Sequence, residues 1–184
     1  ERRGAAAHAA WTEQAAFARD YLAGLFAPSN TTATLETFAT NAFATNAAAE
    51  TVTLNGKVWR ITQGFSAAHP AYDLVPMDGD DAITPIKEGG SVLWAGPDER
   101  EELIMHPEWD RGNFVMLYYG GHYGAHGLFY YCHAEELYVV LGQTVLLDTP
   151  LGKMGNTGYT NGGKHWHVRH QIDGVDRDWV REGV

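Results

Sequence analysis

Two histidines separated by a single residue lie near the C-terminal end of the sequence, in the segment Lys164–Arg169. The run around them is apolar and typical of a β-strand, in which residues i and i+2 point to the same face. His165 and His167 are therefore predicted to project side by side. Because polar side chains on one face of a short apolar strand build a poor core, this face is predicted to line a site. Imidazole pairs bind metal ions or transfer protons.

Two further motifs in the middle of the chain supply metal-binding side chains. His69 and Asp73 stand four residues apart, and on an extended segment this spacing places both side chains on one face. His133 follows the aromatic run Phe129–Cys132. Imidazole and carboxylate groups suit zinc, and a catalytic zinc keeps three protein ligands and one position for water. His69, Asp73 and one histidine of the C-terminal pair would fill that set and leave two histidines for proton transfer.

Short strands separated by turn residues dominate the sequence after residue 50. The dipeptide Asn55-Gly56 stands between the runs Thr51–Leu54 and Lys57–Thr62 and is typical of a type I′ hairpin turn. Gly, Pro, Asn or Asp residues separate most of the later candidates, without helical patterns between them. The predicted fold is mainly β, an antiparallel sandwich or barrel. The later strand candidates are Ile83–Ile86, Ser91–Ala95, Asn113–Tyr119, Gly127–His133, Thr144–Leu147 and His165–Ile172.

The first 50 residues have a different pattern. Between Ala5 and Phe26, apolar residues recur at spacings of three and four, which predicts an α-helix that ends before Pro28. The next stretch, Thr31–Ala49, is rich in Ala, Thr and Asn and contains a five-residue repeat, too short for a solenoid unit. We therefore expect an N-terminal helix and connector over residues 1–50 and one β domain over residues 51–184.

Composition excludes several classes of function. A formal net charge of −10 argues against a nucleic-acid binder and against tight adhesion to an anionic membrane. Cys132 is the single cysteine, so an internal disulfide and a Cys-rich zinc module are excluded. No run of about eighteen apolar residues is present to span a bilayer. The sequence begins at Glu1 without Met or a signal peptide, which we interpret as a processed or trimmed product.

Taken in order, the motifs resemble the catalytic domain of LytM/lysostaphin-type zinc metallopeptidases. That family carries an HxxxD motif, a YxH element, a glycine-studded turn and a final HxH. Here these elements stand as His69–Asp73, Tyr131–His133, Gly152–Gly158 and His165–His167. The resemblance covers about Trp59 to Ile172, most of the chain after the connector.

The resemblance implies a LytM-type antiparallel β domain with an open groove. It implies zinc bound by His69, Asp73 and His167, with His133 and His165 as catalytic histidines whose individual roles stay open. It also implies an endopeptidase that hydrolyses peptide bonds in peptidoglycan cross-links or stems, located outside the cell, in the cell wall or in the periplasm. We expect a monomer. The bond that is cut, and a host or phage origin, are not readable from the sequence.

Two alternatives compete with this interpretation. A non-enzymatic LytM domain would regulate a partner hydrolase, but such domains typically lose zinc ligands and all three are present here. A carrier domain without metal would give no reason for His69 and Asp73. One departure from the family pattern is Ala71, which stands where the first motif usually has glycine. Since Ala adopts positive φ only at a cost, that turn is predicted to differ in shape.

The remaining candidates receive structural interpretations. Trp166 and His170 should point away from the site, on the opposite face of the strand from His165 and His167. His122 and His126 belong to a glycine-rich segment that is predicted to be a surface hairpin.

Overall fold

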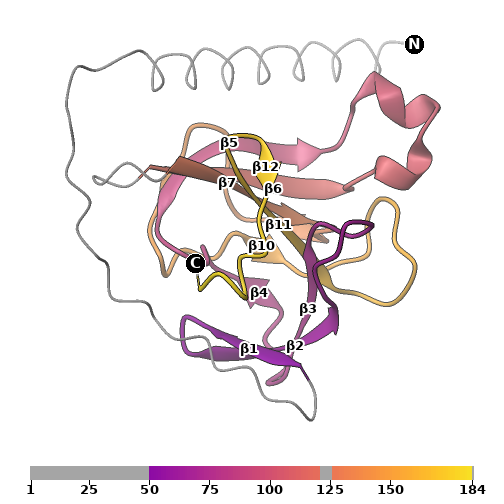
Figure 1. The fold of residues 1–184 in the computed structure, drawn as a ribbon. Coiled ribbons are helices and arrows are strands. Elements are labelled where there is room, and N and C mark those ends of the chain that lie inside the picture. The colour runs from indigo at the N-terminus through magenta and orange to yellow at the C-terminus, as the bar shows by residue number, and fades with distance from the viewer. Residues whose placement is uncertain (1–49, 121–125, 184) are drawn as a thin grey trace.

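A computed structural model of the chain describes residues 50–120 and 126–183. The predicted helix Ala5–Phe26 and its connector lie outside the described residues, as does His122. The described residues form antiparallel β-sheet with two short 3-10 turns (Figure 1), so the predicted fold class is confirmed. Within them, no helix has the length and the apolar character that crossing a membrane requires.

Two sheets account for the strands. The larger sheet has the order β1-β2-β3-β11-β7-β6-β5-β9, with β12 paired to β11, and the smaller has the order β4-β10-β8. The strands are β1 (Thr51–Leu54), β2 (Lys57–Gln63), β3 (Tyr72–Pro76), β4 (Ala82–Ile83), β5 (Gly90–Pro97), β6 (Asn113–Gly120), β7 (His126–Cys132), β8 (Glu136–Leu137), β9 (Thr144–Val145), β10 (Gly152–Lys153), β11 (Trp166–Ile172) and β12 (Val175–Asp176). The 3-10 turns η1 (Glu101–Ile104) and η2 (Pro107–Trp109) lie between β5 and β6.

Strand β11 shows how the larger sheet acquires one core face and one polar face. Trp166, Val168 and His170 are fully buried, whereas the residues between them are half-buried. Because successive side chains of a strand point to opposite faces, His167 and Arg169 lie on the other face. The predicted separation of His170 and Trp166 from His167 is confirmed.

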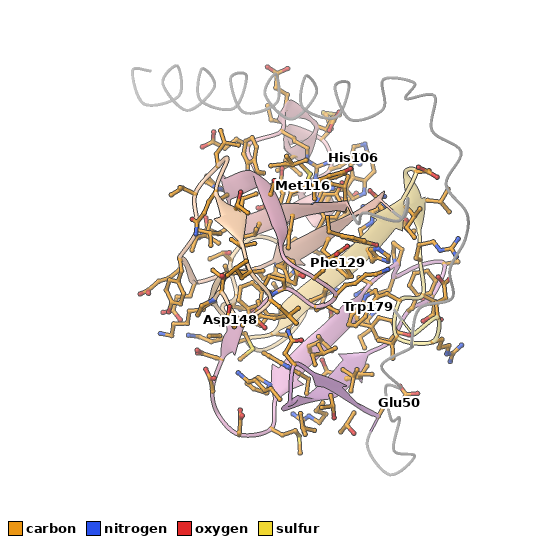
Figure 2. All side chains as sticks on the ribbon, turned by 90° about the vertical axis from the view of Figure 1, so that its left-hand side faces the viewer. Glu50, His106, Met116, Phe129, Asp148 and Trp179 are labelled. Atoms are coloured by element: carbon orange, nitrogen blue, oxygen red, sulfur yellow. The ribbon has the colours of Figure 1, made fainter. Side chains whose placement is uncertain are left out.

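Large aromatic side chains fill the core behind that face. Phe129 of β7 and Trp179 lie inside the body in Figure 2, with ring centroids 6.0 Å apart. The Trp179 ring also meets Tyr72 of β3 edge-on at 5.1 Å. Each fully buried ring of this size contributes about 1.5–3 kcal/mol through removal of apolar surface from water. The packing therefore fixes β3, β7 and β11 relative to one another, and these strands carry or adjoin the site residues.

The hairpin prediction is confirmed in detail, and two strand predictions are too long. Asn55 and Gly56 have φ of 49° and 80°, the two positive values that a type I′ turn requires. The predicted strand Thr144–Leu147 is reduced to β9, since Leu146 and Leu147 are exposed and only two residues pair with β5 at the sheet edge. Similarly, Ile83–Ile86 contributes to a strand only through Ile83, in β4.

Three connections gather on the polar side of the larger sheet. They are the β2–β3 loop, the segment with η1 and η2, and the β10–β11 loop, which lie on the right-hand side of Figure 1. Residues from all three line one groove. The sheet supplies its floor and the loops supply its walls.

Candidate metal centre and groove

A groove of about 920 Å³ opens over the ends of β3, β7 and β11. It contains all five residues that the motifs single out. Strand β3 carries Asp73, β11 carries His167, and His69, His133 and His165 stand on the adjoining loops.

Three side chains converge on one point of the groove floor. The Nε2 atom of His69 and the Nδ1 atom of His167 lie 3.2 Å and 3.0 Å from Oδ1 of Asp73, and 3.2 Å from each other. His167 and Asp73 are register partners on neighbouring strands, so the sheet itself fixes two of the three. His69 reaches the same point from a short turn closed by a bridge between Ser66 and His69. The HxxxD segment is therefore a turn followed by a strand, rather than one extended segment.

The spacing of these three atoms suits a zinc ion. Ligand atoms held tetrahedrally at about 2.0–2.1 Å from one zinc lie roughly 3.3 Å apart, close to the three separations here. Two imidazole nitrogens and one carboxylate oxygen are also a donor set that zinc prefers. The residues present therefore fit the metal that the motifs imply.

Backbone carbonyls fix the tautomers of three of the histidines. The Nδ1 atoms of His69, His133 and His165 lie 3.2, 2.8 and 2.9 Å from the carbonyl oxygens of Gly64, Thr157 and Gly163. A carbonyl oxygen only accepts, so each Nδ1 carries the hydrogen and each neutral ring keeps its lone pair on Nε2. Carbonyl anchors of this kind orient metal-binding and catalytic imidazoles.

The anchored tautomer makes the convergence point a cation site. The lone pair on Nε2 of His69 faces the carboxylate of Asp73 at 3.2 Å, which is repulsive unless a proton or a metal ion lies between them. Burial acts to raise the pKa of Asp73, but hydrogen bonds and charge from His167 and His69 hold that pKa well below its ordinary value. Burial acts to lower the pKa of His69, and Asp73 overrides it and raises that pKa. Asp73 thus stays ionised and attracts a cation.

His133 is held in a backbone conformation that few residues adopt. Its φ is 70°, and its amide donates to the carbonyl of Arg111 at 2.9 Å. The glycine-studded turn packs directly against it, because a Cβ on Gly155 would lie 2.6 Å from the carbonyl oxygen of His133 and 2.3 Å from the amide of Glu135. Burial lowers the pKa of His133 to about 4, against the opposing hydrogen bond with Thr157. At neutral pH this imidazole is therefore neutral.

His165 completes the cluster. It lies immediately before β11, where it bridges to Gly155. Its Nε2 atom is 3.7 Å from Oδ1 of Asp73, and its ring centroid is 5.1 Å from that of His133. The two rings meet edge-on and lie beside the three converging ligand atoms.

Three residues outside the cluster are buried and have structural places. His170 is buried and stacks on Phe129 with ring centroids 4.3 Å apart. Cys132 is also buried, and burial raises its pKa to about 12, so the thiol stays protonated. Ala71 is buried and has no positive φ, in contrast to the freedom that a glycine would offer there.

Sequence reasoning missed the groove walls. The lining includes arginines from four separate segments and two half-exposed aromatic residues, Trp109 and Tyr159. None of them belongs to the HxxxD, YxH or HxH motif, and only the assembly of strands and loops from distant parts of the chain brings them to the groove. The arginines are Arg60, Arg100, Arg111 and Arg169.

Comparisons with known proteins give matches among solved structures. No family model and no curated protein matches the chain. Lysostaphin, the antimicrobial peptidase of Staphylococcus simulans, is similar over 65% of this chain and 43% of its own, at 19% identity and a TM-score of 0.46. The chain thus spans less than half of the lysostaphin chain.

Two other solved structures are similar at the same level. The catalytic domain of the prophage-encoded M23 protein EnpA of Enterococcus faecalis matches 65% of this chain and 84% of its own, at 16% identity and a TM-score of 0.46. A zinc-containing peptidase from Vibrio cholerae matches 78% of this chain and 40% of its own, at 17% identity and a TM-score of 0.46. These three solved structures are peptidases, and two of them are of the lysostaphin or M23 type that the order of the motifs predicted.

Proposed function

We propose that the protein is a zinc-dependent endopeptidase that hydrolyses peptide bonds in bacterial peptidoglycan cross-links or stems. The observation that carries the proposal is the convergence of His69, Asp73 and His167 beside two further histidines with fixed tautomers. A groove of about 920 Å³ gives an extended peptide access to that point. A structural zinc site would be closed by a fourth protein ligand and would need neither the groove nor the extra histidines.

His69, Asp73 and His167 would hold the zinc ion. When bound there, zinc would polarise the scissile carbonyl and lower the pKa of a water molecule toward neutrality. The chain's own contribution is to hold the three ligand atoms at the right separation before the ion arrives. It does so through the register of β3 with β11 and through the hydrogen bond from His69 to Gly64.

His133 and His165 would handle protons. Each donates Nδ1–H to a backbone carbonyl and keeps a lone pair on Nε2, so each can accept a proton from an attacking water. Once protonated, the same nitrogen can donate to an oxyanion or to the leaving amine. Because the anchors are backbone atoms, the rings keep their orientation through both stages.

Digestion of purified peptidoglycan tests the proposal. The protein should release fragments with new amino and carboxyl termini, detected by mass analysis, and a zinc chelator should abolish the release until zinc is restored. Metal analysis of the purified protein should give about one zinc per chain, and less than half an equivalent would count heavily against the enzyme. A zinc-loaded protein that cuts no wall peptide would favour the non-enzymatic regulator.

A further inference from the structure

The groove is cationic although the molecule is acidic. The chain has 13 Lys and Arg residues against 23 Asp and Glu residues. Among the described residues, the groove reverses this balance, since five cationic side chains line it against three acidic ones. One of the three acids is Asp73, which the zinc site would use. The lining therefore presents cationic side chains to an anionic group, although Asp98, Asp176 and Glu135 pair with three of them from outside the lining.

Apart from Arg60, which is exposed on β2, Arg111 has the least completely paired charge among the cationic side chains that line the groove. Arg169 is matched by a bidentate pair with Asp176 at 2.6 and 2.8 Å, and Lys164 is paired with Glu135 at 2.5 Å. Arg111 shares its counter-ion instead. Asp98 accepts two short hydrogen bonds from the Arg100 guanidinium, at 2.8 and 2.9 Å. Its Oδ2 atom lies 3.4 Å from Nη1 of Arg111.

The surroundings of Arg111 hold its guanidinium in place. The side chain of Asp98 is only 1% exposed, and it also accepts a hydrogen bond from the Arg111 amide. The guanidinium carbon lies 5.4 Å and 5.3 Å from the ring centroids of Phe114 and Tyr130. Apart from the bond to Asp98, the guanidinium has no hydrogen-bond partner in the part of the chain that the structure describes. A guanidinium fixed in this way against aromatic faces matches a carboxylate in geometry and charge.

The position of Arg111 relates this charge to the bond that would be cut. Its carbonyl accepts the amide of His133, so the two residues are adjacent in space. Tyr130, beneath the guanidinium, precedes by two residues Cys132, the register partner of His167. At about 3.3 Å per residue, Tyr130 lies roughly 7 Å along β7 from Cys132, which is beside the zinc-ligand candidate His167. An extended peptide spans this distance with about two residues.

We propose that Arg111 is a specificity-determining residue that binds a carboxylate of the substrate about two residues from the scissile bond. The inference rests on the proposed function, because it assigns a subsite to the same groove. The carboxylate comes either from a chain end or from an acidic side chain, and the chemistry of recognition is the same for both. Neutral peptides of equal length are cut, but more slowly.

Paired soluble wall peptides test the inference. Muropeptides released by a muramidase are used as they are, or after carbodiimide coupling to ammonia, which converts every carboxylate to a carboxamide. The zinc-loaded protein should cleave the acid form with a kcat/KM about tenfold or more above that of the amide form, and added salt should reduce the ratio. Synthetic peptides with a free or amidated C-terminus, and with an acidic or amidated side chain, then identify the source of the carboxylate.

Substitutions assign the preference to Arg111. Arg111→Gln should bring the ratio to about one while cleavage of the amide form stays within about threefold of the original protein. Arg111→Lys keeps the charge and should keep part of the preference. Arg181→Gln removes an exposed arginine outside the groove and should leave the ratio unchanged.

The outcomes separate the two proposals. Equal cleavage of both forms by the original protein would overturn the inference and leave the endopeptidase standing, whereas no cleavage of either form would remove the endopeptidase. A purely structural role for Arg111 would lower both rates together and preserve the ratio, which would also overturn the inference. If Arg111→Gln fails to fold, the salt dependence of the ratio and the Arg111→Lys variant still decide.

Discussion

At the scale of single residues, the site depends on which ring nitrogen each histidine presents. Three histidines donate Nδ1–H to backbone carbonyls and present Nε2. His167 differs, because it presents Nδ1 to Asp73 from near the start of strand β11. The two histidines of the HxH motif therefore share a face but meet Asp73 through different atoms, which agrees with different tasks for them.

Replacing His167 should remove the metal. In His167→Ala, two of the three ligand atoms remain, and zinc affinity should fall by at least a hundredfold because a catalytic zinc site relies on three protein ligands. Zinc content after dialysis measures this directly. His106→Ala, which alters an exposed histidine outside the groove, is the matched control and should keep its zinc. Full zinc retention by His167→Ala would exclude the ligand assignment.

Replacing His165 should separate metal binding from turnover. The Nε2 atom of His165 is 3.7 Å from Asp73, farther than the atoms of the converging set. His165→Ala should thus keep about one zinc per chain and lose about a hundredfold or more in kcat, the usual cost of removing one group that stabilises a transition state. Rates on muropeptides and metal content are measured on the same preparation. Normal turnover would show that His165 takes no part in the chemistry.

The motifs predicted the converging set but not its anchors. The HxH and HxxxD intervals allowed His69, Asp73 and one histidine of the pair to be grouped as candidates, and the resemblance to the peptidase family then selected His167. The carbonyls of Gly64, Thr157 and Gly163 could not be predicted, since any residue type supplies a carbonyl and only loop geometry decides where it points. The same reason hid Arg111, which stands in no motif.

At the scale of elements, the glycine-studded turn Gly152–Gly158 holds His133 in position. Thr157 in this turn accepts the Nδ1–H of His133, and its hydroxyl donates to the carbonyl of Ala134. Gly155 lets the backbone approach residues 133–135 closely. The turn and the YxH element therefore form one unit, although about twenty residues separate them in the sequence.

Gly155→Ala should break that unit. The added methyl group would lie 2.3 Å from the amide nitrogen of Glu135 and 2.6 Å from the His133 carbonyl oxygen, and both are backbone atoms that cannot turn aside. We expect a loss of about 1–3 kcal/mol in the free energy of unfolding, as for other overpacked sites. Activity should fall further than stability because His133 is displaced.

Denaturant unfolding and muropeptide cleavage measure both effects for Gly155→Ala. The control is Gly96→Ala in β5, outside the groove lining, since a Cβ on Gly96 meets only Trp94 Nε1 at 3.7 Å, an ordinary contact. Unchanged stability and turnover in Gly155→Ala would contradict the prediction, because they would show that the turn accommodates the methyl group without displacing His133.

Strands that two features of the sequence indicate were predictable in their bounds, and a strand that one feature indicates was not. The β1–β2 hairpin combined alternation with Asn55-Gly56, and β11 combined alternation with flanking turns. The run Thr144–Leu147 had hydrophobicity alone, and its last two residues are exposed because β9 pairs only briefly at the sheet edge. Pairing between distant strands, such as β3 with β11, is a property of the whole sheet and not of either segment.

At the scale of the whole molecule, the larger sheet separates two environments for histidine. On the groove face, the rings meet carbonyls, a carboxylate and solvent. On the core face, His170 is fully buried, with Nε2 2.6 Å from the hydroxyl of Tyr119. Its Nδ1 has no hydrogen-bond partner among the described residues. The alternation of side chains along the strand predicted that His170 points away from the site, but not that the core would hold a neutral imidazole.

His170 should make the stability of the fold depend on pH. Burial, aided by the charges of Lys87 and Arg177, lowers the pKa of His170 to about 4, against an ordinary value near 6.5 in the unfolded chain. Between these two values the unfolded chain binds the proton and the folded chain does not, so unfolding is favoured as the pH falls. The contribution is fully present above pH 6.5 and is lost progressively down to pH 4, by about 3 kcal/mol in total.

The variant His170→Gln isolates this contribution, because glutamine keeps a polar group near Tyr119 and does not ionise. Urea unfolding of the metal-free protein is measured from pH 7.5 to pH 4 for the original protein, for His170→Gln and for the exposed-site control His106→Gln. The other titrating groups are common to the first two proteins and cancel in their difference. His170→Gln should be less stable at pH 7.5, and the gap should narrow steadily below pH 6.5. A gap that stays constant down to pH 4 would mean that His170 takes up its proton equally in both states, and that the core tolerates the charge.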